Sequence, residues 1–420
     1  MLVQFTVENF RSIKDSVTFS MVSGTNNEMN LHLVRDYKLL ASAAIYGANG
    51  SGKSNVLRGF GFMRSMVLNT TKVFQSTDVL PHEPFRLSAE TEAASSVFEA
   101  VFFQNNIKYR YGFEADSTTI YSEWLFADEK GKEAKLFFRD VDDSEFYVNP
   151  DKFKEGKGIT VLPNSLFLWK CDQGGGEISK SILEWFSKVN LINGLKPTKY
   201  LAYTLKEMED KDFRSEIIKL ITAADLGIED IVINQSDVPL ADLEKLPFPQ
   251  KMKDRILSNG SALASVDIMV AHNKFDADGK KVGTVNFELT SDESEGTKKF
   301  FCLSAPLIDT LKNGNVLLVD ELESSLHPLL TSTLISLFND PLINKKGAQL
   351  IFATHDTNLL NQKLFHKSQI WFCEKGSLGT THITSLVEYK NIRLNDNIER
   401  SYLHGKFGAI PYLGYFKEAK

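Results

Sequence analysis

The chain has 420 residues, of which 42% are hydrophobic and 24% are charged, a composition typical of a folded protein with more than one compact lobe. Its apolar runs are too short to cross a membrane, its first residues lack a basic signal-peptide start, and its three distant cysteines argue against a disulfide framework or a zinc site. We therefore expect a cytoplasmic protein. A net charge of −6 gives no global attraction to nucleic acid, although it does not exclude a local basic patch that binds nucleic acid.

The first functional motif lies at residues 47–54, which fit the phosphate-binding loop pattern G-x-x-x-x-G-K-[ST]. An apolar run at 39–46 predicts a buried strand before it, and residues 55–68 have a helical pattern after it, so a chance glycine-rich turn is the weaker interpretation. In such a loop, backbone N–H groups turn toward phosphates, Lys53 meets the β and γ groups, and Ser54 can bind Mg²⁺. We expect ATP and Mg²⁺ as cofactors, and nucleotide contacts from Asn49, Gly50, Ser51, Gly52, Lys53 and Ser54.

Strand and helix patterns alternate in blocks over the middle of the chain. Residues 96–104, 107–115 and 118–126 are β-rich runs separated by polar turns, and they predict an antiparallel β lobe. Residues 151–255 carry helical patterns, at 180–189 and 211–223, without a sustained heptad repeat, and they predict a compact inserted lobe. Further on, residues 276–279 predict a hairpin turn rather than a calcium loop, which would need a distal glutamate.

The segment Ser294-Glu295-Gly296-Thr297 opens a helical stretch at 298–311. A hydroxyl and unpaired N–H groups at a helix N-terminus form a favourable environment for an anion. The sequence therefore predicts a phosphate contact here.

An apolar strand predicted at 315–319 ends in Asp320 and Glu321. In P-loop enzymes such a strand lies beside the phosphate loop, with its first carboxylate near Mg²⁺, so we predict Asp320 and Ser54 as the metal ligands. Glu321 is the predicted catalytic residue that orients and deprotonates the attacking water. The alternative is that both carboxylates cap a helix starting near Ser324, but the phosphate loop upstream favours catalysis.

His355 follows a third predicted strand, at 349–353. Open α/β sheets bind ligands at the carboxyl ends of their strands, and an imidazole there can reach a γ-phosphate. We predict His355 as a second catalytic residue, with a structural role as the alternative.

The order of these motifs resembles that of the ABC-type ATPases, specifically their soluble SMC/RecF-like branch. The resemblance implies an α/β fold, a P-loop ABC-type ATPase head with an antiparallel β lobe and an inserted helical lobe. It divides the chain into an N-terminal ATPase half (1–150), the insertion (151–255) and a C-terminal ATPase half (256–420).

The resemblance also assigns the segment at 294–297. Ser294 and Gly296 correspond to the signature motif, which completes the ATP site of the opposite subunit in a head-to-tail dimer. Glu295 and Thr297 depart from the commonest signature, L-S-G-G-Q, in the manner of RecF-like and defence ATPases. Residues 323–328 resemble the loop through which the two subunits sense each other.

Two further positions are assigned by resemblance. Arg11 lies just after the first predicted strand, where relatives place an arginine near the nucleotide, and a plain structural ion pair is its alternative. Gln75 is the candidate for the glutamine of the Q-loop, because it lies in a polar loop after the first helix.

The N-terminal strand with Asn9–Ile13, the run Gln369–Phe372 and the segment 402–411 narrow the resemblance to a bacterial group of stand-alone ABC-fold ATPases. That group includes RloA, AbiLi and the AriA subunit of the PARIS anti-phage system. It implies an ATP-hydrolysing switch that controls a separate effector, such as a nuclease or toxin, and that answers to a phage protein. A RecF/SMC-like DNA-repair ATPase is the alternative, and a detached transporter ATPase fits less well.

Overall fold

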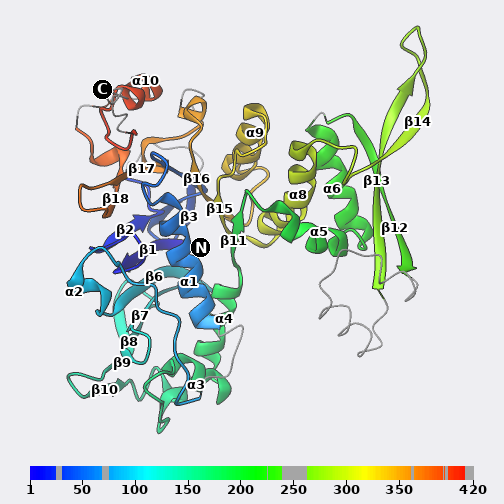
Figure 1. Cartoon of the computed structure of the whole chain (residues 1–420). Coiled ribbons are helices and arrows are strands. Elements are labelled where there is room, and N and C mark those ends of the chain that lie inside the picture. Colours follow the sequence, from blue (N-terminus) through cyan, green and yellow to red (C-terminus); the bar gives the residue numbers. More distant parts are fainter. Residues whose placement is uncertain are drawn as a thin grey trace, which may run out of the picture. The chain divides into compact units, whose positions relative to one another are not determined.

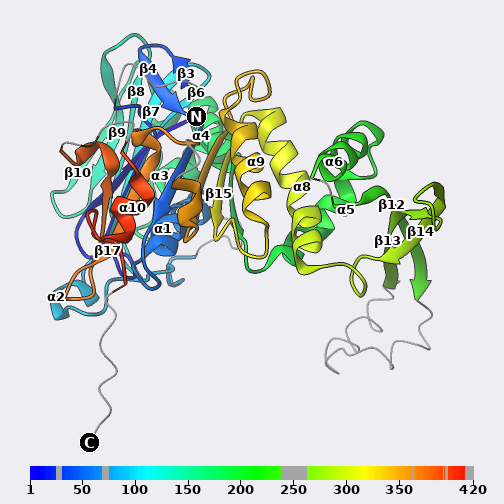
Figure 2. The ribbon, with the colours of Figure 1, turned by 90° about the horizontal axis from the view of Figure 1, so that it is seen from above.

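The computed structural model describes residues 1–24, 31–68, 75–224, 226–238, 263–360, 364–390, 392 and 396–411. The chain forms two compact units (Figures 1 and 2). The first unit combines two segments, Met1–Leu195 and Asp309–Lys420, and the second unit is Lys196–Ile308. Among the residues described, no helix combines the length and the apolar character that a membrane crossing requires.

A six-stranded sheet in the first unit carries the predicted motif strands. Its order is β11-β15-β16-β5-β17-β18, and all neighbours are parallel except β17 and β18. Every residue of β5, β15 and β16 is buried, as expected for a sheet covered on both faces. The carboxyl ends of these three strands therefore meet at one edge. The bounds are β5 (Ser42–Tyr46), β11 (Val189–Asn193), β15 (Val316–Asp320), β16 (Gln349–Thr354), β17 (Ile370–Lys375) and β18 (Thr381–Ser385).

A seven-stranded antiparallel sheet confirms the predicted β lobe, in the order β10-β9-β8-β7-β6-β1-β2. β6 and β7 cover the predicted residues, whereas β8 begins two residues later than predicted because Asp116 Oδ1 accepts hydrogen bonds from the N–H groups of Thr118 and Thr119 in the preceding turn. The bounds are β1 (Leu2–Glu8), β2 (Val17–Ser20), β6 (Ser96–Gln104), β7 (Ile107–Ala115), β8 (Ile120–Asp128), β9 (Glu133–Asp140) and β10 (Glu145–Val148); β3 (Leu31–Val34) and β4 (Tyr37–Leu40) form a separate pair.

Helix α1 (Lys53–Leu68) packs against strands of both sheets. Phe60 on this helix stacks on Phe5 of β1, with ring centroids 4.7 Å apart, and on Trp185, at 6.2 Å. Burying one such side chain contributes about 1.5–3 kcal/mol. The start of α1, where the phosphate loop ends, is therefore fixed by a continuous core.

Helices α3 (Phe167–Gln173) and α4 (Glu177–Ser187) belong to the first unit, although the sequence analysis placed them in the insertion at 151–255. Trp185 of α4 stacks on Phe102 of β6 at 3.8 Å. The buried Glu123 of β8 accepts hydrogen bonds from the N–H groups of Phe167 and Leu168 and pairs with Arg139 at 3.1 Å. These contacts fasten the two helices to the antiparallel sheet, so the second unit starts later than the predicted insertion.

An aromatic cluster holds the C-terminal segment against β17. The ring of Phe372 lies 5.3 Å from Tyr402 and 4.8 Å from Phe407, and Tyr46 at the end of β5 is 6.1 Å from Tyr402. The segment at 402–411 therefore packs close to the start of the phosphate loop. The remaining helices of this unit are α2 (Ala89–Glu92), α9 (Pro328–Asn339) and α10 (Ile398–Leu403), with short 3₁₀ turns at Lys154–Gly156, Thr357–Leu360, Lys367–Gln369 and Leu386–Glu388.

The second unit combines helices with a three-stranded antiparallel sheet of order β12-β13-β14. The sequence analysis predicted only helices for the inserted lobe. The pattern at 211–223 does form a helix, whose N-cap Asp210 accepts a hydrogen bond from the N–H of Phe213 at 2.8 Å. Residues 239–262 of the predicted insertion lie outside the described residues. The bounds are a 3₁₀ turn at Pro197–Tyr200, α5 (Leu201–Glu207), α6 (Lys211–Ala223), β12 (Ile228–Val238), β13 (Leu263–Phe275), β14 (Lys281–Glu288) and α8 (Glu295–Asn313), which runs into the first unit.

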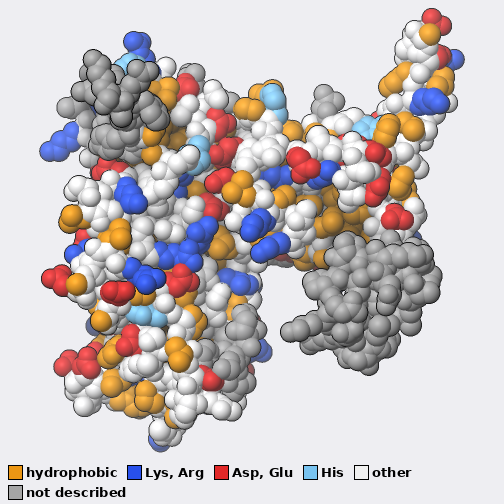
Figure 3. All heavy atoms as spheres, viewed as in Figure 1, with side chains coloured by type: hydrophobic (Ala, Val, Ile, Leu, Met, Phe, Trp, Pro, Cys, Tyr) orange, Lys and Arg blue, Asp and Glu red, His pale blue; other side chains and the backbone are white. Residues whose placement is uncertain are grey.

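The hairpin of β13 and β14 confirms the predicted turn at 276–279. The N–H of Asp276 donates to Lys280 O at 3.0 Å, and Gly279 has a φ of +78°. Apolar side chains on the hairpin, including Phe275, Val282 and Phe287, are exposed among charged ones (Figure 3). The hairpin thus buries little surface of its own.

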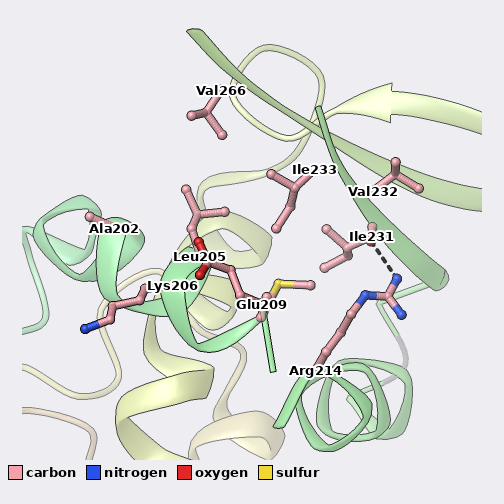
Figure 4. Close-up of a pocket in the computed structure, with 10 residues that line it drawn as sticks. Ala202, Leu205, Lys206, Glu209, Arg214, Ile231, Val232, Ile233 and Val266 are labelled. Atoms are coloured by element: carbon pink, nitrogen blue, oxygen red, sulfur yellow. Dashed lines mark hydrogen bonds between the residues drawn. The ribbon is translucent and has the colours of Figure 1, made fainter. Parts of the chain in front are cut away.

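A groove of about 660 Å³ lies in the second unit beside α5 and the first two strands of its sheet (Figure 4). Leu205, Ile233 and Val266 contribute apolar surface, and the guanidinium of Arg214 donates to Ile231 O at 2.9 Å. Charged side chains of Lys206 and Glu209 also line it. The groove is therefore apolar with a charged margin.

Candidate functional site

Residues 47–52 connect β5 to α1, so the phosphate-loop motif has the strand and helix that it requires. Gly52 has a φ of +109°, and a Cβ at this position would lie 2.0 Å from Thr381 Oγ1. Only glycine fits there. The first N–H groups of α1 have no intrahelical acceptor and lie at the positive end of the helix dipole, as a phosphate requires. The nucleotide contacts of the predicted loop residues Asn49, Gly50, Ser51 and Gly52 stay predictions.

Lys53 is only 5% exposed, and its ammonium lies against the loop. Nζ donates hydrogen bonds to Gly47 O at 2.7 Å and to Ala48 O at 3.1 Å. Burial lowers the pKa of Lys53 below that of an ordinary lysine, while neighbouring acidic groups oppose the shift; these groups are Cys373, Glu323, Asp320 and Glu321. The only charge in the loop motif is thus held within the loop, surrounded by acidic groups.

Ser54 and Asp320 meet although they lie 266 positions apart in the sequence. Ser54 Oγ donates to Asp320 Oδ1 at 2.8 Å, and Arg58 Nη2 lies 3.9 Å from Asp320 Oδ2. A hydroxyl and a carboxylate are the hard oxygen ligands that suit Mg²⁺, which takes few protein ligands and completes its shell with phosphates and water. In the described part of the chain, no group of three or more His, Cys, Asp or Glu side chains could hold a metal ion.

Glu321 is half-buried and has a φ of +57°, in the left-handed region. Such a backbone costs about 1–3 kcal/mol for a non-glycine residue and is found preferentially at functional sites. Gly194, at the end of β11, accommodates this turn, because a Cβ there would lie 2.2 Å from Glu321 O. The interpretation that Asp320 and Glu321 cap a helix near Ser324 is wrong, since α9 begins at Pro328 and its N-cap is His327.

His355 directly follows β16, and its Nε2 lies 3.1 Å from Lys53 Nζ. Burial of part of the ring and the charge of Lys53 lower the pKa of His355, with Glu323 and Glu321 opposing. A neutral imidazole can accept the hydrogen bond that an ammonium donates. The structure thus brings His355, Lys53 and Glu321 within electrostatic reach of one another.

Glu323 is a site carboxylate whose position the sequence analysis did not predict. Its Oε1 accepts a hydrogen bond from the backbone N–H of His355 at 2.6 Å, and its Oε2 is buried with no hydrogen-bond partner among the described residues. The sequence analysis placed Glu323 in the segment at 323–328 that resembles a subunit-sensing loop, and it predicted no contact with His355. Its orientation depends on the turn that follows β15.

Arg11 forms the structural ion pair that was the alternative to a nucleotide contact. Its Nη2 lies 2.6 Å from Glu83 Oε2, and its backbone N–H donates to Glu83 O at 2.7 Å. A partly exposed pair of this kind contributes at most about 1 kcal/mol. Gln75 is exposed, and its backbone bonds with Asp78 and Asn164. The nucleotide roles of Arg11 and Gln75 stay predictions.

Ser294 caps α8 in the second unit. Its Oγ accepts a hydrogen bond from the N–H of Thr297 at 3.1 Å, and Gly296 lies in the first turn. Carboxylates flank this helix start, but Glu295 pairs with Lys298 at 2.8 Å and Glu293 with His272 at 2.7 Å. The phosphate-contacting roles of Ser294 and Gly296 stay predictions.

A cavity of about 260 Å³ adjoins the phosphate loop. One wall comes from the loop and another from the end of β17 and the C-terminal segment at 409–411. The sequence analysis used the segment at 402–411 only for the family resemblance and did not predict that it lies at the loop. The lining residues are Ala48, Asn49, Ser51, Glu374, Lys375, Ala409, Ile410 and Pro411.

The family model described as "AAA domain, putative AbiEii toxin, Type IV TA system" matches residues 42–361, which include the phosphate loop, Asp320 and His355. The chain belongs to this AAA family. Membership of the narrower RloA, AbiLi and AriA group remains a proposal. A comparison with curated protein sequences finds no match.

Solved structures similar to this AAA family member include an SMC head domain from Thermotoga maritima, at 13% identity and a TM-score of 0.40, covering 91% of this chain and 98% of that one. A second similar structure is that of the recombination mediator protein RecF of the RecFOR pathway, at 14% identity and a TM-score of 0.35. The match covers 92% of this chain and 98% of that one. A third is CbiO1 from Clostridium perfringens, part of an ABC transporter complex, at 12% identity and a TM-score of 0.30. The match covers 92% of this chain and 90% of that one.

Proposed function

We propose that this AAA family member is a molecular switch that binds and hydrolyses ATP. The observation that carries the proposal is the Ser54–Asp320 hydrogen bond of 2.8 Å beside the buried Lys53, because it joins the phosphate loop to the carboxylate strand in one site. Bound Mg²⁺ would supply charge neutralisation for the phosphates. Ser54 and Asp320 would hold the metal ion, and Lys53 would bind the β- and γ-phosphates.

The carboxylate of Glu321 orients the attacking water and accepts its proton. His355 follows the adjacent strand, its Nε2 lies 3.1 Å from Lys53 Nζ, and it would contact the γ-phosphate together with Lys53. The hydrogen bond from the backbone N–H of His355 to Glu323 Oε1 holds the backbone that carries the imidazole. Glu321 and Glu323 follow β15, His355 follows β16, and Lys53 opens α1 after the loop that follows β5, so the parallel sheet sets the spacing of the four side chains.

The proposed ATP-bound state is a head-to-tail dimer, in which Ser294 and Gly296 of one subunit contact the γ-phosphate held by the other. Ser294→Arg should place a bulky cation at the start of α8 and prevent closure, so ATP-dependent dimerisation should be lost while ATP still binds each subunit. Light scattering with and without ATP measures the dimer, and a fluorescent ATP analogue measures binding.

Two variants accompany this test. Ser294→Ala removes only the hydroxyl that caps the helix, at a cost of about 1 kcal/mol in stability, and should reduce dimerisation less. Thr290→Arg places the same cation on an exposed position of the preceding turn and should leave dimerisation unchanged. Normal ATP-dependent dimers of Ser294→Arg would remove Ser294 from the trans site.

The biological role that we propose is sensing in an anti-phage, abortive-infection system, with damage done by a separate effector protein. The description of the family as a putative AbiEii toxin of a toxin–antitoxin system supports a role in growth arrest. A closing and opening dimer provides a bistable element, so that a phage protein needs only to shift its equilibrium to release an effector.

The test is a phage challenge of cells that express the chain alone or together with the product of the adjacent gene. Protection should require both proteins and should be lost in Glu321→Gln. Protection or growth arrest by the chain alone would show that it carries its own effector activity. Hydrolysis that rises on addition of DNA would instead favour the DNA-repair alternative.

A further inference from the structure

We propose that Thr381 is a positioning residue that sets the conformation of the phosphate loop, through a relay of hydrogen bonds that begins at Asn55 and passes through Ser12. This inference rests on the proposed ATP-binding function. Thr381 opens β18, is 1% exposed and lies outside every motif of the sequence analysis. The relay joins three segments that are distant in the sequence, those of Ser12, of Ser51 and Asn55, and of Thr381.

The direction of the relay follows from counting protons. Thr381 Oγ1 donates its single proton to Ser51 O at 2.9 Å. The bond of 2.8 Å between Ser12 Oγ and Thr381 Oγ1 therefore uses the proton of Ser12. Ser12 Oγ is then free to accept from Asn55 Nδ2, at 2.7 Å. Each hydroxyl thus donates once and accepts once, and such chains strengthen cooperatively.

The relay ends on the peptide bond that precedes Gly52. In a planar trans peptide the C=O and the N–H point in opposite directions. By holding Ser51 O on the side of β18, Thr381 turns the N–H of Gly52 to the opposite side. Because a loop of this kind binds phosphate through its inward N–H groups, the orientation of this peptide bears directly on affinity. The backbone N–H of Thr381 also donates to Ser12 O at 2.7 Å, which fixes β18 itself.

The relay joins the loop to the segment that follows β1 as well. Asn55 lies in the first turn of α1, and Ser12 is the neighbour of Arg11, whose ion pair with Glu83 holds the same turn. The Ser51 carbonyl receives a second, weaker contact from Cys373 Sγ at 3.5 Å. Loss of the Thr381 hydroxyl would therefore loosen the loop without removing a group that touches phosphate.

The experiment compares Thr381→Val, Thr381→Ser and wild type in ATP affinity, turnover and melting temperature. Thr381→Val should weaken ATP binding about five- to tenfold, the usual effect of one lost hydrogen bond, with a much smaller change in kcat. Thr381→Ser keeps the hydroxyl and should restore affinity. The matched control is Thr18→Val, which removes an exposed threonine hydroxyl that bonds Thr6 Oγ1 at 3.0 Å. It should leave ATP affinity unchanged.

A double-mutant cycle tests whether Ser12 and Thr381 act through the same relay. Ser12→Ala alone should also weaken ATP binding, and the combination with Thr381→Val should add little further loss, because both changes break one relay. Additive effects, or wild-type affinity in both Thr381→Val and Ser12→Ala, would overturn the inference. If the wild-type protein failed to bind ATP, the proposed function would be wrong. If the wild type binds ATP and the Thr381 variants bind it equally well, only the inference about Thr381 is wrong.

Discussion

Replacing Lys53 with alanine is expected to reduce ATP affinity by roughly a hundredfold or more, because charge-assisted hydrogen bonds to the β- and γ-phosphates contribute about 1.5–3 kcal/mol each. Hydrolysis should fall with binding. The fold should survive, since among the described residues the ammonium bonds to the loop carbonyls of Gly47 and Ala48 and to His355, all within the site itself. Isothermal titration calorimetry with ATP and Mg²⁺ measures the affinity, and circular dichroism checks the fold.

Lys375→Ala is the matched control, because Lys375 is an exposed lysine at the end of β17 that lines the cavity beside the same loop. It should keep most of the affinity. A folded Lys53→Ala protein that binds ATP as tightly as wild type would remove the phosphate loop from the nucleotide site.

Replacing Glu321 with glutamine is expected to slow hydrolysis by about 10²–10⁴-fold, the usual contribution of a general base. Glutamine keeps the size and one oxygen of the side chain but cannot accept the proton of water. ATP binding should remain, since Lys53, Ser54 and Asp320 are unchanged. The variant should therefore accumulate as an ATP-bound dimer, which size-exclusion chromatography with light scattering would detect.

The control for this change is Glu374→Gln, which removes an exposed carboxylate at the end of β17, beside the phosphate loop. Its turnover should stay close to that of wild type. Unchanged turnover in Glu321→Gln would exclude Glu321 as the base, and Glu323, whose carboxylate contacts His355, would then be the next residue to replace.

Local patterns were sufficient to predict the strands and the loop that meet at the proposed nucleotide site. The strands before the loop, before Asp320 and before His355 are short apolar runs, and parallel pairing of β5, β15 and β16 brings their carboxyl ends together without further information. The same holds for β6 and β7, where alternation and polar turns define the strands. Lys53, Ser54 and Asp320 therefore lie where the motifs predict.

Features that depend on tertiary contacts could not be predicted. The helical patterns of α3 and α4 look alike whether they lie in an insertion or in the core, and only Glu123 and the aromatic rings decide between the two. The relay through Thr381 joins Ser12, Thr381 and Ser51, whose positions in the sequence follow no helix or strand periodicity that would predict the contact. The left-handed backbone of Glu321 is permitted by Gly194, a residue that no motif connects to it.

The first unit is discontinuous, and this has a consequence for synthesis on the ribosome. β11 pairs in parallel with β15, and the whole of the second unit lies between these two strands in the sequence. β5 likewise pairs with β16, which comes much later in the sequence. The nucleotide site therefore stays incomplete until the strand before His355 has emerged, whereas the second unit, a continuous segment, can fold earlier. Because closing a longer loop adds only about 0.6 kcal/mol for each doubling of length, the interruption has little effect on final stability. Its effect is on timing, since the proposed ATP site can form only after β16 has been synthesised.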